Sequence, residues 1–213
     1  SLVDKAYSQN SETNYYLKKL NVKDIKSIGN LKFIEHDMLE INHSDKKLFS
    51  QFKKFKTFVA ASTHNTEELF AAKTHILLKK KIKNIITIII PRHIDRVDQI
   101  ISQISELGLN VVSHKSNKKK LSNIDIYVVD TFGESKKFYK LATTVLLGGS
   151  IIKRGGQNPL EPARFGAKIL HGPNIDNFKD VYKYLNQLKI SSSINSPQQC
   201  ANSIIFKKNM KKV

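Results

Sequence analysis

The sequence of 213 residues is poor in cysteine, in acidic side chains and in long apolar runs. Its single cysteine, Cys200, excludes an internal disulfide and argues against a thiolate metal cluster, which fits a reducing compartment. No apolar run approaches the roughly 20 residues that a membrane-spanning helix needs, and no signal peptide opens the chain. We therefore expect a soluble chain.

Acidic residues are outnumbered two to one, with 18 Asp and Glu against 36 Lys and Arg, and the formal net charge is +18. Such a field attracts nucleic acid, an anionic membrane face or phosphorylated substrates. A bias in base composition would produce the same excess, because the chain is rich in Lys, Ile and Asn together. The lysine run at 118–120 lies in an expected loop without interleaved aromatic residues, which favours a solvated charge run over a nucleic-acid contact.

From residue 57 onward, short apolar runs alternate with helical patterns. Residues 94–107 repeat apolar side chains at spacings of three and four, which predicts an amphipathic helix. The alternation predicts an α/β fold with a Rossmann-like parallel sheet and helices on both faces. Six buried strands are expected, at residues 58–61, 85–90, 111–112, 124–129, 145–147 and 169–170.

The remaining segments suggest a division of the chain. Residues 1–30 contain a polar helix, at about 11–20, and residues 37–56 have the composition of a charged connector. We expect residues 1–50 to be the end of another domain with its linker, and residues 51–190 to form the sheet domain. Residues 191–213 are expected to be a tail with a helix at 197–206.

The most unusual stretch is 148–173, where two glycine pairs remove Cβ atoms from successive turns and would let a ligand approach backbone N–H groups. Asn158 and Pro159 predict the start of a short helix that ends near Gly166. The N-terminus of such a helix favours an anion, and the carboxylate of Glu161 suits sugar or ribose hydroxyls. The alternative is a pair of structural turns.

Ligands of parallel sheets bind beyond the carboxyl ends of the strands. Arg92 could pair a phosphate through its planar guanidinium, although a solvated arginine is the alternative. The backbone at Gly133 and Glu134 could hold a phosphate or a base edge, and His64 and Glu67 could serve proton transfer or substrate hydroxyls. No metal-ligand spacing surrounds them, so we expect no metal. Four such loops follow strands directly, at 62–68, 91–93, 131–134 and 148–161.

Seven segments in order give the chain a resemblance to a known family. It resembles the carboxyl-terminal half of bacterial Kdo transferase, the 3-deoxy-D-manno-octulosonic acid transferase of lipopolysaccharide synthesis. The resemblance extends from about residue 8 to residue 190. Its segments are residues 29–33, 61–64, 91–93, 130–134, 148–150, 154–162, and 172–173 with 177–178.

This resemblance implies the nucleotide-sugar-binding domain of a GT-B glycosyltransferase, which transfers Kdo from CMP-Kdo to the lipid A precursor lipid IV-A without a metal or other cofactor. The family usually has Met where Phe132 stands and His where Gln157 stands. The CMP contacts it implies are Pro91, Arg92, Phe132, Gly133, Glu134, Asn158, Pro159, Leu160 and Glu161. Ser62, His64, Gly148 and Gly149 are further candidates for the donor site.

The resemblance also implies that the general base and the acceptor site lie in an amino-terminal half, so this chain holds no catalytic residue. We expect the chain alone to bind the donor and to transfer little sugar. The whole enzyme would act as a peripheral protein on the anionic cytoplasmic face of the bacterial inner membrane, with no nucleic-acid partner. Two alternatives are a GT-B transferase or epimerase that uses a UDP-sugar, and a basic nucleic-acid-binding α/β module.

Overall fold

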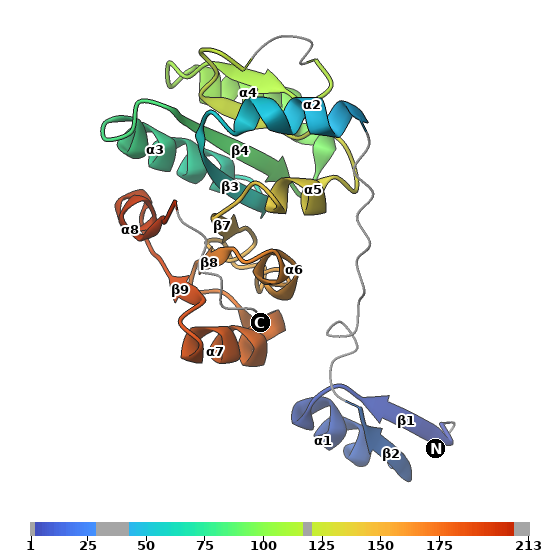
Figure 1. Cartoon of the computed structure of the whole chain (residues 1–213). Helices are drawn as coiled ribbons and strands as arrows, with labels where there is room; N and C mark the ends of the chain where they lie inside the picture. The colour runs from blue at the N-terminus through green and yellow to red at the C-terminus, as the bar shows by residue number, and fades with distance from the viewer. Residues whose placement is uncertain (1–2, 29–42, 117–120, 207–213) are drawn as a thin grey trace. The chain divides into compact units, whose positions relative to one another are not determined.

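The structure is a computed structural model that describes residues 3–28, 43–116 and 121–206. The chain forms two compact units, Ser1–Leu39 and Glu40–Val213 (Figure 1). One segment of the family resemblance, residues 29–33, lies outside the described residues, and so does the lysine run at 118–120.

The first unit is a small βαβ element. Strands β1 (Lys5–Ser8) and β2 (Asp24–Ser27) pair in parallel, and helix α1 (Ser11–Lys19) connects them. The side chain of Asn10 caps this helix, because its Oδ1 accepts the N–H of Thr13 at 2.8 Å. The helix expected at about 11–20 is confirmed. The two strands were not predicted, since both are short and mostly exposed and carry no buried apolar pattern.

The second unit contains a seven-stranded sheet in the order β5-β6-β4-β3-β7-β8-β9, in which every neighbouring pair is parallel. The Rossmann-like parallel sheet predicted from the alternation of strands and helices is therefore confirmed. Its strands are β3 (Lys56–Thr63), β4 (Ile85–Pro91), β5 (Val111–Ser113), β6 (Ile126–Val128), β7 (Thr144–Leu147), β8 (Lys168–His171) and β9 (Ser191–Ser193).

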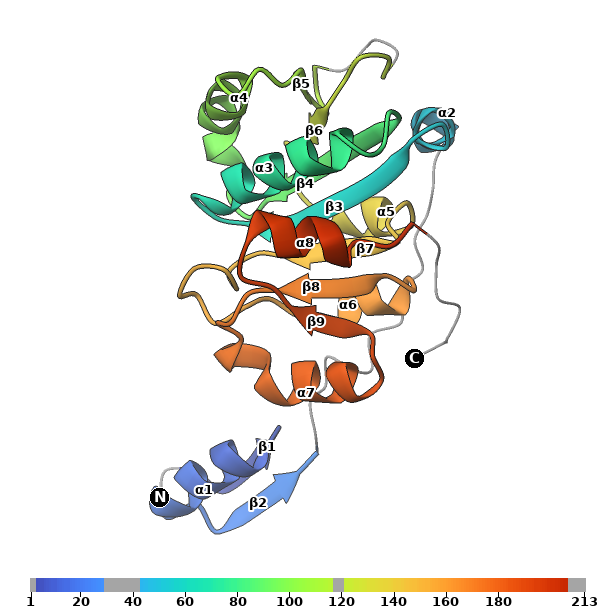
Figure 2. The same cartoon turned by 90° about the vertical axis from the view of Figure 1, so that its left-hand side faces the viewer.

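Helices cover both faces of this sheet, as its two apolar cores show. Along β3, Val59 and Ala61 contribute to one core, and Phe58 and Ala60 contribute to the other, as the alternation of a strand requires. The first core is closed by α2 (His43–Phe52), α5 (Ser135–Tyr139), α6 (Leu160–Arg164) and α7 (Lys179–Gln187). The second is closed by α3 (Glu67–Lys79), α4 (Val97–Ser105) and α8 (Pro197–Ser203), which lie in front of the sheet in Figure 2.

Residues 43–52 form helix α2, so the expectation of a charged connector over 37–56 is wrong for this part. Phe52 is fully buried, and its ring lies 5.2 Å from that of Tyr127 and 6.3 Å from that of Phe138. This helix packs on the sheet, so the division between the units falls at residues 39 and 40 and not at residue 50. The helical pattern is weak in the sequence, because Leu48, Phe49 and Phe52 stand among charged and polar residues.

Residues 191–206 are part of the second unit and not a separate tail. Strand β9 extends the sheet by pairing with β8, and α8 packs on α3. Cys200 on α8 is completely buried. The helix expected at 197–206 is present at Pro197–Ser203, whereas β9 was missed because three serines show no apolar alternation.

Strand β3 lies in the middle of the sheet, where the chain order reverses. It pairs with β4 on one side and β7 on the other. In such a sheet, a crevice forms beyond the carboxyl ends of the strands at the reversal point. The loops after β3, β4, β6 and β7 all leave the sheet at this edge, so the fold places the four predicted loops together.

Candidate functional site

The loop between β3 and α3 is held in a specific shape by a break in the strand. The register of β3 against β4 shifts between Ala61 and Thr63, and Ser62 adopts a left-handed φ of +54°. Thr66 is also left-handed, with a φ of +78°, and its side chain makes no helix-capping hydrogen bond. The side chains of Asn65 and Glu68 do not cap this helix either, since both accept hydrogen bonds from Arg96 at 3.2 Å.

The carboxylate of Glu67 occupies the first glycine turn. Its Oε2 accepts the N–H groups of His64 at 3.0 Å and Gly149 at 2.7 Å. Its Oε1 accepts those of Ser150 at 3.2 Å and Ile151 at 3.0 Å. Glu67 is only 1% exposed, so it joins the loop after β3 to the loop after β7. The role in proton transfer considered for Glu67 is thus replaced by a structural one.

The glycine pair 148 and 149 does not present bare N–H groups to a ligand. The N–H of Gly148 donates to the carbonyl of Ala61 at 2.8 Å, and that of Gly149 donates to Glu67. A Cβ on Gly148 would lie 2.3 Å from the carbonyl oxygen of Ser62, so this glycine allows the two loops to pack closely. The expectation that these N–H groups cradle an anion is wrong. Whether these two residues touch the donor in another way stays a prediction.

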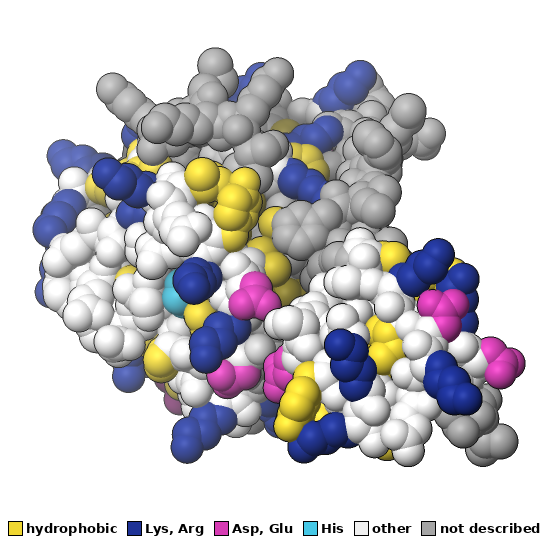
Figure 3. Space-filling model, turned by 90° about the horizontal axis from the view of Figure 1, so that it is seen from below, with side chains coloured by type: hydrophobic (Ala, Val, Ile, Leu, Met, Phe, Trp, Pro, Cys, Tyr) yellow, Lys and Arg dark blue, Asp and Glu magenta, His cyan; other side chains and the backbone are white. Residues whose placement is uncertain are grey.

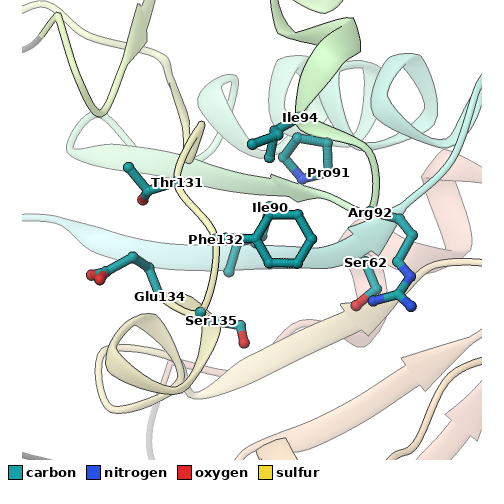
Figure 4. A pocket seen from close by; sticks show the side chains of 10 residues that line it. Ser62, Ile90, Pro91, Arg92, Ile94, Thr131, Phe132, Glu134 and Ser135 are labelled. Carbon is teal, nitrogen blue, oxygen red and sulfur yellow. The ribbon is translucent and has the colours of Figure 1, made fainter.

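At the end of β4, the backbone of Arg92 is held by a hydrogen bond and its side chain is exposed. Its N–H donates to the carbonyl of Thr63 at 2.9 Å. Within residues 3–28, 43–116 and 121–206, its guanidinium forms no ion pair. In Figure 4 this guanidinium points toward Ser62. A cation held in this way can receive an anionic group of a ligand.

The loop after β6 supplies an exposed aromatic ring. Phe132 is 77% exposed, which is unusual for a side chain of this size, and Gly133 next to it has a φ of +77°. Glu134 is engaged elsewhere, because its carboxylate lies 2.9 Å from Nζ of Lys137. This ion pair raises the pKa of Lys137. The ring of Phe132 is therefore the feature of this loop that is best placed to contact a ligand.

Three of the four predicted loops meet in one pocket with a volume of about 80 Å³. Figure 4 shows the ring of Phe132 at Ile90, with Pro91 and Ile94 above the ring in this view and Arg92 to one side of it. The pocket is small compared with the roughly 300–1,000 Å³ of most ligand sites, so it can enclose only part of a nucleotide. It is lined by Ser62, Ile90, Pro91, Arg92, Ile94, Thr131, Phe132, Gly133, Glu134 and Ser135.

The residues predicted from the second half of the glycine stretch do not line this pocket. Helix α6 begins one residue later than predicted and has only five residues, and Oδ1 of Asn158 already accepts the N–H of Leu160 at 3.1 Å. Glu161 approaches α5, the helix that follows the loop after β6, because Nζ of Lys136 lies 3.7 Å from its carboxylate. The segment from Asn158 to Glu161 is thus next to α5, and its role in binding stays a prediction.

His64 lies on the other side of the loop after β3. Its ring is 5.6 Å from that of His93, and its Nε2 is buried without a hydrogen-bond partner in the described part of the chain. Burial lowers the pKa of His64, the carboxylate of Glu67 opposes this, and His93, Arg154 and Arg92 add to the lowering. A neutral imidazole with an unused nitrogen is therefore present at this edge of the sheet.

Among the residues that the structure describes, no group of three or more His, Cys, Asp or Glu side chains is arranged to hold a metal ion. None of the helices within these residues combines the length and apolar character needed to cross a membrane.

Comparison with known proteins supports the resemblance found from the motifs. The chain is 30% identical over 189 residues to the 3-deoxy-D-manno-octulosonic acid transferase of Rickettsia bellii, which covers 88% of this chain and 45% of that protein. It is 28% identical over 185 residues to the enzyme of the same name from Haemophilus influenzae, covering 85% of this chain and 42% of that protein. The chain therefore spans less than half the length of these curated relatives. No protein-family model matches it.

The fold is similar to that of a solved structure, the C-terminal CMP-Kdo binding domain of WaaA from Acinetobacter baumannii. The TM-score is 0.69 at 23% sequence identity, and the match covers 75% of this chain and 84% of that domain. This likeness confirms the Rossmann-like α/β fold that the sequence predicted.

Proposed function

We propose, because this chain resembles the carboxyl-terminal half of the Kdo transferases, that it is the donor-binding domain of such a glycosyltransferase and binds CMP-Kdo. The observation that carries the proposal is the convergence of Arg92 and Phe132 on one pocket beside the central strand β3. An arginine without an ion pair in the described part of the chain can receive the single phosphate of the donor, and an exposed aromatic ring can stack on its base.

In this proposal, residues of the pocket and of the segment from Asn158 to Glu161 bind different parts of the donor. The ring of Phe132 and the backbone at Gly133 and Glu134 hold the cytosine, and Pro91 with Arg92 holds the phosphate. Asn158, Pro159, Leu160 and Glu161 face the ribose and the sugar, where a carboxylate can accept hydrogen bonds from hydroxyl groups.

We further propose that the phosphate needs neither a metal nor another cofactor. Charge builds up on the phosphate as CMP leaves, and a guanidinium that is already in place stabilises it without reorganisation. Arg92 can serve in this way, since its backbone is fixed by the hydrogen bond to Thr63 and its side chain is exposed.

The transfer itself would require groups beyond this chain. Because the chain spans less than half the length of its relatives, we propose that the general base and the site for lipid IV-A belong to the remainder of the whole enzyme. The chain alone should bind CMP-Kdo and transfer little sugar to lipid IV-A. Robust transfer by the chain alone would contradict the proposal that the general base and the acceptor site lie outside this chain.

The test of donor binding is isothermal titration with CMP and with UDP. We expect CMP to bind more tightly than UDP, and Arg92→Ala to weaken CMP at least about tenfold, the scale of one charge-assisted hydrogen bond. Arg164→Ala is the matched control, because Arg164 is exposed on α6 and does not line the pocket. Tighter binding of UDP would favour the alternative, a transferase or epimerase that uses a UDP-sugar.

The positive charge suggests where the whole enzyme works. We propose a peripheral association with the anionic cytoplasmic face of the inner membrane, driven by the net charge of +18. On the face that Figure 3 shows, Lys and Arg side chains are scattered among other residues, whereas nucleic-acid-binding domains usually gather them in a patch or stripe. Binding to generic duplex DNA that is indifferent to Arg92→Ala would favour that alternative function instead.

A further inference from the structure

Three hydrogen-bonding side chains surround Gly149, next to the pocket. The position that a Cβ would take on this glycine lies 3.3 Å from Nε2 of Gln157, 3.4 Å from Cβ of Arg154 and 3.5 Å from Cδ2 of His64. Gly149 has a φ of +65° and its own N–H is bound by Glu67. Its contribution is thus a narrow space, about the size of one methyl group, between the three side chains and not a backbone donor.

The groups around this space are suited to an anion. Arg154 is exposed, and none of the described carboxylates forms an ion pair with it. Nε2 of His64 is buried and has no hydrogen-bond partner in the described residues. The nearby carboxylate of Glu67 does not compete for these groups, because both of its oxygens accept two backbone N–H groups.

This space adjoins the place proposed for the phosphate. Gly148 packs against the backbone of Ser62, and Ser62 lines the pocket together with Arg92. The ring of His64 contacts that of His93 at 5.6 Å, directly after Arg92 in the chain. Two positively charged places, one at Arg92 and one at Arg154, therefore lie side by side around the loop after β3.

The proposed donor carries two anions on one carbon atom. Kdo is an octulosonic acid, so its anomeric carbon bears a carboxylate as well as the oxygen linked to the phosphate of CMP. A site for this donor needs two adjacent anion-binding places, whereas a site for CMP alone needs one.

We infer that Arg154, Gln157 and His64 form a subsite over Gly149 for the carboxylate of the sugar, beside the phosphate place at Arg92. This inference rests on the proposed function. The guanidinium of Arg154 supplies the charge, and Nε2 of Gln157 and a ring nitrogen of His64 supply further hydrogen-bond donors. The subsite would select a 2-keto acid sugar over a neutral sugar carried by the same nucleotide.

The test compares two ligands on three variants by isothermal titration. Freshly prepared CMP-Kdo carries the carboxylate and CMP does not. We expect Arg154→Met to weaken CMP-Kdo about tenfold and to leave CMP within twofold of the wild type. Arg154→Lys keeps the charge and should retain most of the affinity for CMP-Kdo, whereas Arg92→Ala should weaken both ligands.

The outcomes separate this inference from the proposed function. If the wild type binds CMP-Kdo but Arg154→Met weakens CMP and CMP-Kdo equally, or neither of them, the carboxylate subsite is refuted and the donor domain stands. If Arg154→Lys loses as much affinity as Arg154→Met, the contact is not one of charge and the subsite is likewise refuted. If the wild type binds neither ligand, the proposed function fails and the subsite fails with it. Arg92 and Arg154 are both exposed in the wild type, so none of these substitutions should unfold the protein. Thermal melting of each variant confirms that it is folded.

Discussion

At Glu67 one carboxylate satisfies four backbone N–H groups from two loops that are more than 80 residues apart in the chain. Replacing it with glutamine keeps the size but turns a terminal oxygen into an NH2 group, which faces N–H donors and leaves them unsatisfied. We expect Glu67→Gln to lower the free energy of unfolding by at least about 2 kcal/mol. Urea denaturation measures this loss.

Glu106→Gln is the control for this substitution, since Glu106 is exposed at the end of α4 and accepts no such set of bonds. It should change the free energy of unfolding by less than about 0.5 kcal/mol. An equally small effect of Glu67→Gln would show that the four bonds do not hold the loops together.

The residues around the pocket could be predicted because they combine an unusual residue type with a position directly after a strand. Arg92, Phe132 and Gly133 were all expected at this edge, and the structure brings them into one pocket. The role of Glu67 could not be predicted. A glutamate in the first turn of a helix has the same local signal whether it faces solvent or a distant loop, and only the tertiary contact with residues 149–151 distinguishes the two.

At the scale of elements, β9 and α8 complete the sheet and its second core. Ile194, Cys200 and Ile204 are almost fully buried there, and α8 packs on α3. Removing residues 191–213 would expose the apolar partners of these side chains, at about 1.5–3 kcal/mol for each large one. We expect the shortened protein to melt more than about 10 °C lower than the full chain, as measured by circular dichroism.

Removal of residues 207–213 alone is the comparison for this truncation, because it keeps all of β9 and α8. Its melting temperature should stay within a few degrees of that of the full chain. If both truncations melt alike, the terminal strand and helix add nothing to the stability of the sheet.

Strands with uninterrupted apolar runs, such as β4, were predicted closely, since burial on both faces leaves a clear signal in the sequence. Elements that lack such a run, β9 and α2, were not predicted. Strand β9 consists of three serines that pair at the edge of the sheet, and α2 is an amphipathic helix whose apolar side is narrow. Both are specified by the partner on which they pack more than by their own composition.

For the molecule as a whole, buried histidines make stability depend on pH. Burial lowers the pKa of His75, where Asp125 opposes the shift, and burial also lowers that of His171. The unfolded chain takes up these protons near pH 6.5, before the folded protein does. Stability should therefore be full above pH 6.5 and fall as the pH drops toward the lowered folded values, by up to about 1.4 kcal/mol for each histidine at pH 5.5.

Urea denaturation of wild type and His171→Gln at pH 7.5 and pH 5.5 tests this dependence. The variant should lose less stability between the two pH values than the wild type. Gln187→Ala serves as the control, because Gln187 is exposed on α7 and has no ionisable group, so its substitution should leave the difference unchanged. Equal losses in all three proteins would exclude His171 as a source of the acid sensitivity.

Because the carboxylate of Glu67 occupies the backbone N–H groups of the glycine turn, these groups are not available to bind the phosphate of a nucleotide. Many phosphate-binding loops use main-chain amides, which no point mutation can delete, but here the protein has filled that position with an internal anion. In the proposed function, the phosphate of the donor is then recognised by mutable side chains, Arg92 above all. Recognition built in this way can be altered by single substitutions without rebuilding the loop, and we expect it to weaken with rising ionic strength more than amide-based recognition does.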